Sequence, residues 1–318
     1  MARKPRIQYP GAVYHVMSRG NHRQRIVQND DDRELFLKTT GEACQKANFQ
    51  VHAFCLMSNH FHLVIETPEG NLVAGMKWLL STYTARHNRR HKLFGHLFSG
   101  RYKALIVDAT TPGYLRTVCE YVHLNPARAK ILSFEDPLRK FRWSSYPEYL
   151  KTPGQRPEWL RVDRVLGELR IPKDSTAGRR RFEEILEERR AMDLREDYRP
   201  LRRGWCLGDD EFKKELLAQM DERRGKWHYG EELRESSEEK AERLVKAALR
   251  NEGWKEADLQ KRPKGDPAKV KMALQLREHT VMTMEWIANR LQMGTRTYLN
   301  HLLYWHRRKK RLTRRSKS

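Results

Sequence analysis

Two histidines separated by one apolar residue, His60 and His62, are the residues of this sequence best suited to bind a metal. They lie in the stretch 57–66, Met-Ser-Asn-His-Phe-His-Leu-Val-Ile-Glu, whose alternation predicts a buried β-strand. Successive strand side chains point to opposite faces, so both imidazoles share one face and Phe61 takes the other. Such a pair can bind a divalent cation, or its members can be ordinary hydrogen-bonded histidines of a sheet. The triplet alone leaves both interpretations open.

A second pair, Tyr121 and Asn125, is four residues apart in a predicted helix. Residues at i and i+4 share a helical face, provided that the helix continues to the boundary at Pro126. The amide oxygen of Asn125 can then be a third donor for a cation on the histidine pair. A tyrosine hydroxyl beside a metal-bound phosphate can attack phosphorus to form a covalent intermediate. The alternative for Tyr121 is a core tyrosine on an apolar helix.

Periodicity and turn signals predict the elements that position these residues. We expect strands at 11–18, 49–56, 60–66 and 104–109, and helices at 30–47, 71–89 and 111–124. Ser58 and Asn59 are the only turn residues between the second and third strands, which predicts a hairpin. Thr111 and Pro112 predict the start of the last helix. This order predicts an α+β fold, a ferredoxin-like antiparallel sheet (split βαβ) with an added helix, and one sheet face open to a ligand.

The charge of the chain points to a polyanionic partner. There are 64 Lys+Arg against 41 Asp+Glu in 318 residues, a formal net charge of +23. Nucleic acid is the first candidate and an anionic membrane surface the second. The sequence has no long apolar run and no apolar segment behind its basic N-terminus, so we expect a cytoplasmic protein without membrane association. The cysteines form no Cys-x-x-Cys pair, which excludes zinc ribbons and disulfide scaffolds.

Composition changes along the chain predict three parts. Residues 1–150 form the sheet domain, 151–205 a proline-containing and partly helical connector, and 206–318 an all-α region.

Within the all-α region, residues 267–308 predict a helix-turn-helix, because a short Gly-containing turn joins two helices. The second helix would present Arg296, Tyr298 and Asn300 to the major groove of duplex DNA.

Five short motifs occur in order over the first half of the chain. They are Gly11-Ala-Val-Tyr-His-Val-Met-Ser-Arg-Gly-Asn, Met57-Ser-Asn-His-Phe-His-Leu-Val-Ile, Gly100-Arg-Tyr-Lys, Tyr121-Val-His-Leu-Asn-Pro-Ala-Arg-Ala and Trp143-Ser-Ser-Tyr. Together they resemble the single-tyrosine HUH transposases, specifically the REP-associated branch. The resemblance implies a nuclease domain that holds Mg²⁺ or Mn²⁺ and breaks single-stranded DNA, leaving a 5′-phosphotyrosine and a free 3′-OH. By this resemblance, His60 and His62 are metal ligands, Tyr121 is the nucleophile and Asn125 is the further ligand.

The resemblance also implies a DNA partner, single-stranded or hairpin DNA such as REP-like inverted repeats, for a protein acting as a monomer or homodimer. Several basic side chains flank the predicted site. They could bind phosphates of the DNA hairpin or of its flanking single strand, or could simply be solvated surface charges. These are Arg19, Arg23, Arg25, Arg101 and Lys103.

Other aromatic and imidazole side chains have weaker interpretations. We expect structural roles for His15, His52 and His123, with a supporting role at the site as the alternative. Trp143 and Tyr146 are candidates either for base stacking or for packing of the domain.

Two functions from different classes therefore compete. The first is a metal-dependent, site-specific endonuclease and strand transferase that acts on sequences flanking a DNA hairpin. The second is a domesticated transposase that regulates through its helix-turn-helix without cleavage. A third, hydrolysis of small phosphoesters, does not account for the charge of +23.

Overall fold

The computed structural model describes residues 6–192, 201, 204–224 and 231–315. The chain divides into two compact units, one of residues 1–44 and 48–229 and the other of residues 45–47 and 230–318. The first unit contains the predicted 1–150 domain apart from residues 45–47, all of the predicted connector 151–205, and residues 206–229 of the predicted all-α region. No helix of the described segments has the length and apolarity to cross a bilayer.

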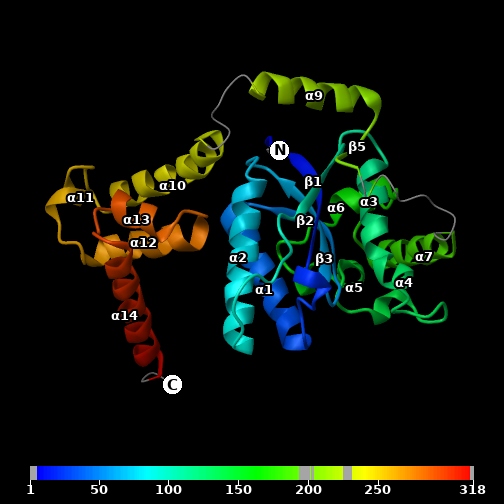
Figure 1. Ribbon diagram of the computed structural model, residues 1–318, viewed down its shortest axis with the longest axis horizontal. Coiled ribbons are helices and arrows are strands. Elements are labelled where there is room, and N and C mark those ends of the chain that lie inside the picture. The colour runs from blue at the N-terminus through cyan, green and yellow to red at the C-terminus, as the bar shows by residue number, and fades with distance from the viewer. Residues whose placement is uncertain (1–5, 193–200, 202–203, 225–230, 316–318) are drawn as a thin grey trace. The chain divides into compact units, whose positions relative to one another are not determined.

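The first unit is built on a mixed sheet, whose described strands follow the order β2-β3-β1-β4-β5 (Figure 1). Their bounds are β1 Ala12–Arg19, β2 Gln50–Leu56, β3 His60–Thr67, β4 Lys103–Val107 and β5 Cys206–Leu207. The first four pair antiparallel, as predicted, and β2 and β3 form the expected hairpin. Strand β5 pairs parallel to β4 and was not predicted, because two residues carry no periodic pattern.

Helices α1 (Asp30–Ala47) and α2 (Leu72–His91) cover one face of the sheet, and α3 (Tyr114–His123) lies on the other (Figure 1). Phe61 of β3 packs against Phe36 of α1, with ring centroids 5.0 Å apart. Helix α1 starts where predicted, because the Asn29 side chain accepts a hydrogen bond from the Asp32 amide and caps it.

Helix α3 starts later than predicted, at Tyr114 rather than at Thr111-Pro112. The Asp108 carboxylate accepts hydrogen bonds from the amides of Thr110 and Thr111, which holds these residues in a turn. Gly113 then enters the helix with φ +99°, a conformation that favours glycine.

The rest of the first unit is helical. Its described helices are α4 Asn125–Arg128, α5 Ser145–Leu150, α6 Asp163–Glu168, α7 Thr176–Met192 and α9 Asp210–Arg224, with short 3₁₀ turns η1 Asn21–Arg23, η2 Leu138–Lys140 and η3 Pro153–Gln155. Helix α7 packs on α5 through stacked rings of Phe182 and Tyr149, 4.7 Å apart.

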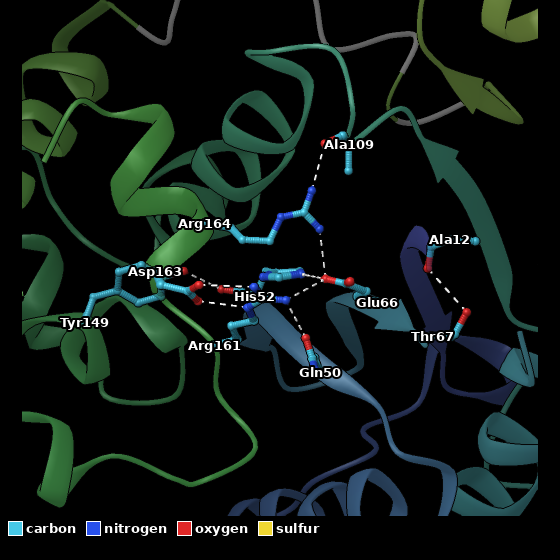
Figure 2. Close-up of polar contacts among 10 residues, drawn as sticks. All are labelled: Ala12, Gln50, His52, Glu66, Thr67, Ala109, Tyr149, Arg161, Asp163 and Arg164. Carbon is cyan, nitrogen blue, oxygen red and sulfur yellow. Dashed lines mark hydrogen bonds and ion pairs between the residues drawn. The ribbon is translucent and has the colours of Figure 1, made fainter. Parts of the chain in front are cut away.

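A polar network joins α6 to the end of β3 that lies away from the two histidines. Figure 2 shows Glu66 at its centre, accepting hydrogen bonds of 2.9 Å from His52 and from Arg164. Arg164 also donates to the backbone oxygen of Ala109, beyond β4. Arg164 thereby holds α6 against β3 and against the segment that follows β4.

The second unit is all helical where it is described, with α10 Glu231–Asn251, α11 Asp258–Lys261, α12 Pro267–His279, α13 Met284–Arg290 and α14 Arg296–Arg315. An apolar core that includes Val245, Leu276 and Ile287 joins these helices. The buried ammonium of Lys269 donates to the backbone oxygens of Leu259, Arg262 and Gln292.

Candidate active site

The register of the sheet gathers polar side chains on the face toward α3. His62 lies opposite Met17 of β1 and His60 opposite Arg19, and Met17 is also opposite Lys103 of β4. Directly paired residues of antiparallel strands point to the same face. Both histidines therefore share this face with two basic side chains of the neighbouring strands, Arg19 of β1 and Lys103 of β4.

Helix α3 brings Tyr121 onto this face. Its ring centroid is 5.9 Å from that of His62 and 5.6 Å from that of His15. Leu124 lies between α3 and α4 but has helical backbone angles, so Asn125 remains on the helical face of Tyr121. The side-chain amide nitrogen of Asn125 donates to the Tyr121 backbone oxygen at 3.2 Å. The i, i+4 relation expected from the sequence is present.

A pocket of about 800 Å³ contains the four residues that the sequence singled out for chemistry, His60, His62, Tyr121 and Asn125. Basic and polar side chains line the rest of it. These include Arg19, Asn21, His22, Arg23, Ser99, Arg101, Lys103 and Arg128.

The two histidines are oriented in a way that suits a metal. His62 Nδ1 lies 2.9 Å from His15 Nε2, and His60 Nδ1 lies 2.7 Å from the Asn59 side-chain oxygen. Each Nδ1 is thus engaged in a hydrogen bond, which leaves each Nε2 to ligate. With the Asn125 amide oxygen, the donor set of two imidazoles and one oxygen fits a divalent cation.

Burial keeps these imidazoles neutral. It lowers the pKa of His60 to about 4, with a further contribution from the Arg19 charge. Burial lowers the pKa of His15 to about 4 and that of His62 well below its usual value. Neutral imidazoles are the form that binds metals, so no proton has to be displaced at neutral pH.

Arg128 was not among the predicted site residues. Its guanidinium lies 4.0 Å from the centre of the Tyr121 ring and donates to the Tyr121 backbone oxygen. The signal was present in the sequence, because Arg128 is seven residues after Tyr121 and so two turns further along the same helical face.

The structure divides the predicted DNA-binding residues into three groups. Arg19, Arg23, Arg101 and Lys103 line the pocket, whereas Arg25 is exposed but outside it. Arg296, Tyr298 and Asn300 are exposed near the start of α14, in the second unit.

The remaining histidines and aromatics have mainly structural contacts. His123 is buried and hydrogen-bonded to the Ser145 hydroxyl, and His52 is bound to Glu66. His15 instead contacts His62 directly. Tyr146 is fully buried in the domain core, and Trp143 stacks with Arg142 outside the pocket.

Residues 267–308, where the sequence predicts a helix-turn-helix, contain α12, α13 and the first part of α14. The turn after α13 contains Gln292 at φ +52° and Gly294 at φ +84°.

Comparisons with known proteins match one part of this chain to a family model. Residues 8–125 match the model of the family described as Transposase IS200 like. Among solved structures, that of a REP-associated tyrosine transposase bound to a REP hairpin is similar, with 11% identity and a TM-score of 0.41. It covers 50% of this chain, and this chain covers 91% of it. No curated protein matches.

Proposed function

We propose, from the match of residues 8–125 to the IS200-like transposases, that this protein is a metal-dependent endonuclease and strand transferase for single-stranded DNA. The observation that carries the proposal is the convergence of His60, His62, Tyr121 and Asn125 in one pocket. The matched segment contains all four residues. Their separation in sequence makes a chance meeting on one sheet face a poor explanation.

The chemistry follows from the donors present. His60, His62 and the Asn125 amide oxygen would hold Mg²⁺ or Mn²⁺, which supplies Lewis-acid polarisation of a phosphate oxygen. The Tyr121 oxygen attacks phosphorus and gives up its proton to solvent. An oxygen–phosphorus bond to the tyrosine forms, and the bond to the 3′ oxygen breaks. The 3′ oxygen takes up a proton, leaving a 5′-phosphotyrosine and a free 3′-OH.

Arg128 supports this step by its position. A guanidinium against the Tyr121 ring stabilises negative charge as the phenol loses its proton. The same cation, at the pocket wall, can bind an oxygen of the reacting phosphate. Arg19, Arg23, Arg101 and Lys103 would hold the neighbouring phosphates of a single strand flanking a hairpin.

A covalent-trapping experiment tests the function. Incubation with Mn²⁺ and a labelled oligonucleotide from the inverted repeats beside its own gene should give a denaturant-resistant protein–DNA adduct. Tyr121→Phe should abolish the adduct. Tyr114→Phe is the matched control, since Tyr114 lies on the same helix but does not line the pocket. An adduct of equal yield with Tyr121→Phe would contradict the assignment.

A second candidate is a domesticated transposase that regulates by binding duplex DNA without cleavage. The observation in its favour is the exposed set Arg296, Tyr298 and Asn300 at the start of α14, where a recognition helix would contact bases. Fluorescence anisotropy separates the candidates. Duplex binding retained in a Tyr121→Phe, His60→Ala variant, together with no cleavage by the unmodified protein, would favour the regulator.

A further inference from the structure

Helices α1 and α2 bring a second group of metal-competent side chains together, on the opposite sheet face from Tyr121. His91 Nε2 lies 2.8 and 2.9 Å from the two carboxylate oxygens of Asp32. His87 Nε2 lies 4.0 Å from Asp32 Oδ2. One donor atom from each of the three residues lies within 4.8 Å of the others. The pocket histidines lie on the other face of the sheet. Phe61, between them in β3, points instead toward α1 and this second group.

The local structure of α1 and α2 fixes the positions of Asp32, His87 and His91. His87 and His91 are at i and i+4 of α2 and so share one helical face, the spacing that helical zinc sites use. Asp32 sits in the first turn of α1, where the Asn29 cap fixes its backbone. The Tyr83 hydroxyl donates to the Ile26 backbone oxygen at 2.6 Å, which ties α2 to the segment that leads into α1.

His87 is the observation that points to a ligand. Its side chain is 1% exposed, and neither ring nitrogen makes a hydrogen bond of ordinary geometry within the described part of the chain. A buried polar group without such a bond destabilises the folded protein. Its Nε2 is directed toward the fully buried carboxylate of Asp32, and a cation between them would give His87 the partner that it lacks.

We propose that Asp32, His87 and His91 bind one Zn²⁺ that cross-links α1 and α2. Two imidazole nitrogens and one carboxylate oxygen suit zinc, whereas Mg²⁺ prefers oxygen ligands. Tetrahedral zinc with ligands at about 2.0–2.1 Å needs donors about 3.3 Å apart. The distances of 2.8 and 4.0 Å from Asp32 Oδ2 bracket that value. Water can fill the fourth position on the side of His91, which is 16% exposed.

The remaining contacts of Asp32 are compatible with this cation. The Gln28 amide donates to Oδ2 at 2.9 Å, and Arg90 Nε lies 3.3 Å from Oδ1. Each carboxylate oxygen has two lone pairs, so Oδ2 can accept the amide and still ligate. The Arg90 charge offsets part of the carboxylate charge, so we expect zinc that a strong chelator removes.

Metal analysis of the full chain tests the site. The His60→Ala, His62→Ala variant removes the proposed nuclease cation, so any zinc that it retains after dialysis belongs elsewhere. We expect one zinc per chain in this background, and none after adding His91→Ala. His96→Ala, at an exposed histidine just beyond α2, is the matched control and should retain the zinc.

The carboxylate ligand has its own matched pair. In the same background, Asp32→Asn should lose the zinc, whereas Asp31→Asn, at the exposed neighbour, should keep it. Co²⁺ added to the His60→Ala, His62→Ala variant in place of zinc should give the visible absorption of a tetrahedral site. This measurement requires no additional mutation. Absence of zinc and of the Co²⁺ spectrum in the His60→Ala, His62→Ala background would overturn the proposal. Zinc that persists in a folded His91→Ala protein would do the same.

Discussion

At the residue scale, a hydrogen bond at one ring nitrogen determines which nitrogen each pocket histidine offers to a cation. His62 is held by His15, and His60 by Asn59. Such partners orient a ligand without touching the metal, and their loss weakens metal binding. We therefore propose that the pocket chemistry depends on His15, for which the sequence left a supporting role as the alternative, and on Arg128, which was not among the predicted site residues.

His15→Gln should weaken Mn²⁺ binding by about 10- to 100-fold, because His62 loses the partner that orients its ring. Calorimetric titration of folded protein measures this. The matched control is His52→Gln, a buried histidine of the same sheet bound to Glu66 rather than to the pocket. It should lower stability but leave the Mn²⁺ affinity of the folded protein unchanged. Equal losses of affinity in both variants would contradict a specific role for His15.

Arg128→Ala should slow single-turnover cleavage by about 100- to 1,000-fold, the effect of removing one group that stabilises transition-state charge. Arg128→Lys should recover only part of the rate, because an ammonium cannot lie flat against the Tyr121 ring. The rate of adduct formation at saturating DNA is the measurement. Arg25→Ala, outside the pocket, should change it less than twofold. An Arg128→Ala rate equal to that of Arg25→Ala would exclude the proposed role.

At the element scale, β3 serves both faces of the sheet. His60 and His62 face the pocket, while Phe61 packs between Phe36 of α1 and Phe98. A slip of one residue in its pairing would exchange these faces and bury the histidines in the apolar core. The network around Glu66 at the other end of β3 helps hold this register.

The Glu66 network predicts a pH dependence of stability. Hydrogen bonds from His52 and then Arg164 lower the pKa of Glu66 from 4.5 to about 2. The ionised form is therefore favoured in the folded protein, and its contribution is complete above about pH 4.5 and lost as the pH falls to about 2.

Glu66→Gln should accordingly lower the free energy of unfolding at pH 7 by about 2 kcal/mol, a typical loss for hydrogen bonds to a charged group. Urea denaturation at several pH values should show this difference shrinking between pH 4.5 and pH 2. Glu184→Gln, which breaks an exposed ion pair with Arg181, should change stability by less than about 0.5 kcal/mol. A Glu66→Gln difference that did not vary with pH would contradict the pKa argument.

At the scale of the whole molecule, the net charge of +23 belongs to a chain of two compact units. The first unit contains the pocket, and the second presents an exposed turn of α14. We expect the charge to supply affinity for DNA in both units and the pocket to supply cleavage in one.

Arg296→Ala combined with Tyr298→Ala should weaken duplex binding by about tenfold or more and leave Tyr121 adduct formation on single strands within about twofold. Fluorescence anisotropy and the covalent assay measure the two effects. Lys271→Ala is the control, since this exposed lysine lies on α12 of the same unit. It removes charge without touching α14 and should have a smaller effect on duplex binding. Equal effects would indicate binding through charge alone.

Local patterns in the sequence were enough to predict the four antiparallel strands, their hairpin and the two covering helices. They were also enough to put His60 with His62 on one face and Tyr121 with Asn125 on another, because strand and helix periods are properties of neighbouring residues.

The tertiary structure decided which distant residues meet. The register of β1 against β3 brings His15 to His62, and the Asp108 turn delays the start of α3. It also places Arg23 at the pocket and Arg25 outside it, and pairs Asp32 with two histidines of another helix. Such contacts depend on strand register, turn geometry and helix packing between segments far apart in the chain. A local pattern specifies which face a residue occupies, but not which distant residue that face will meet.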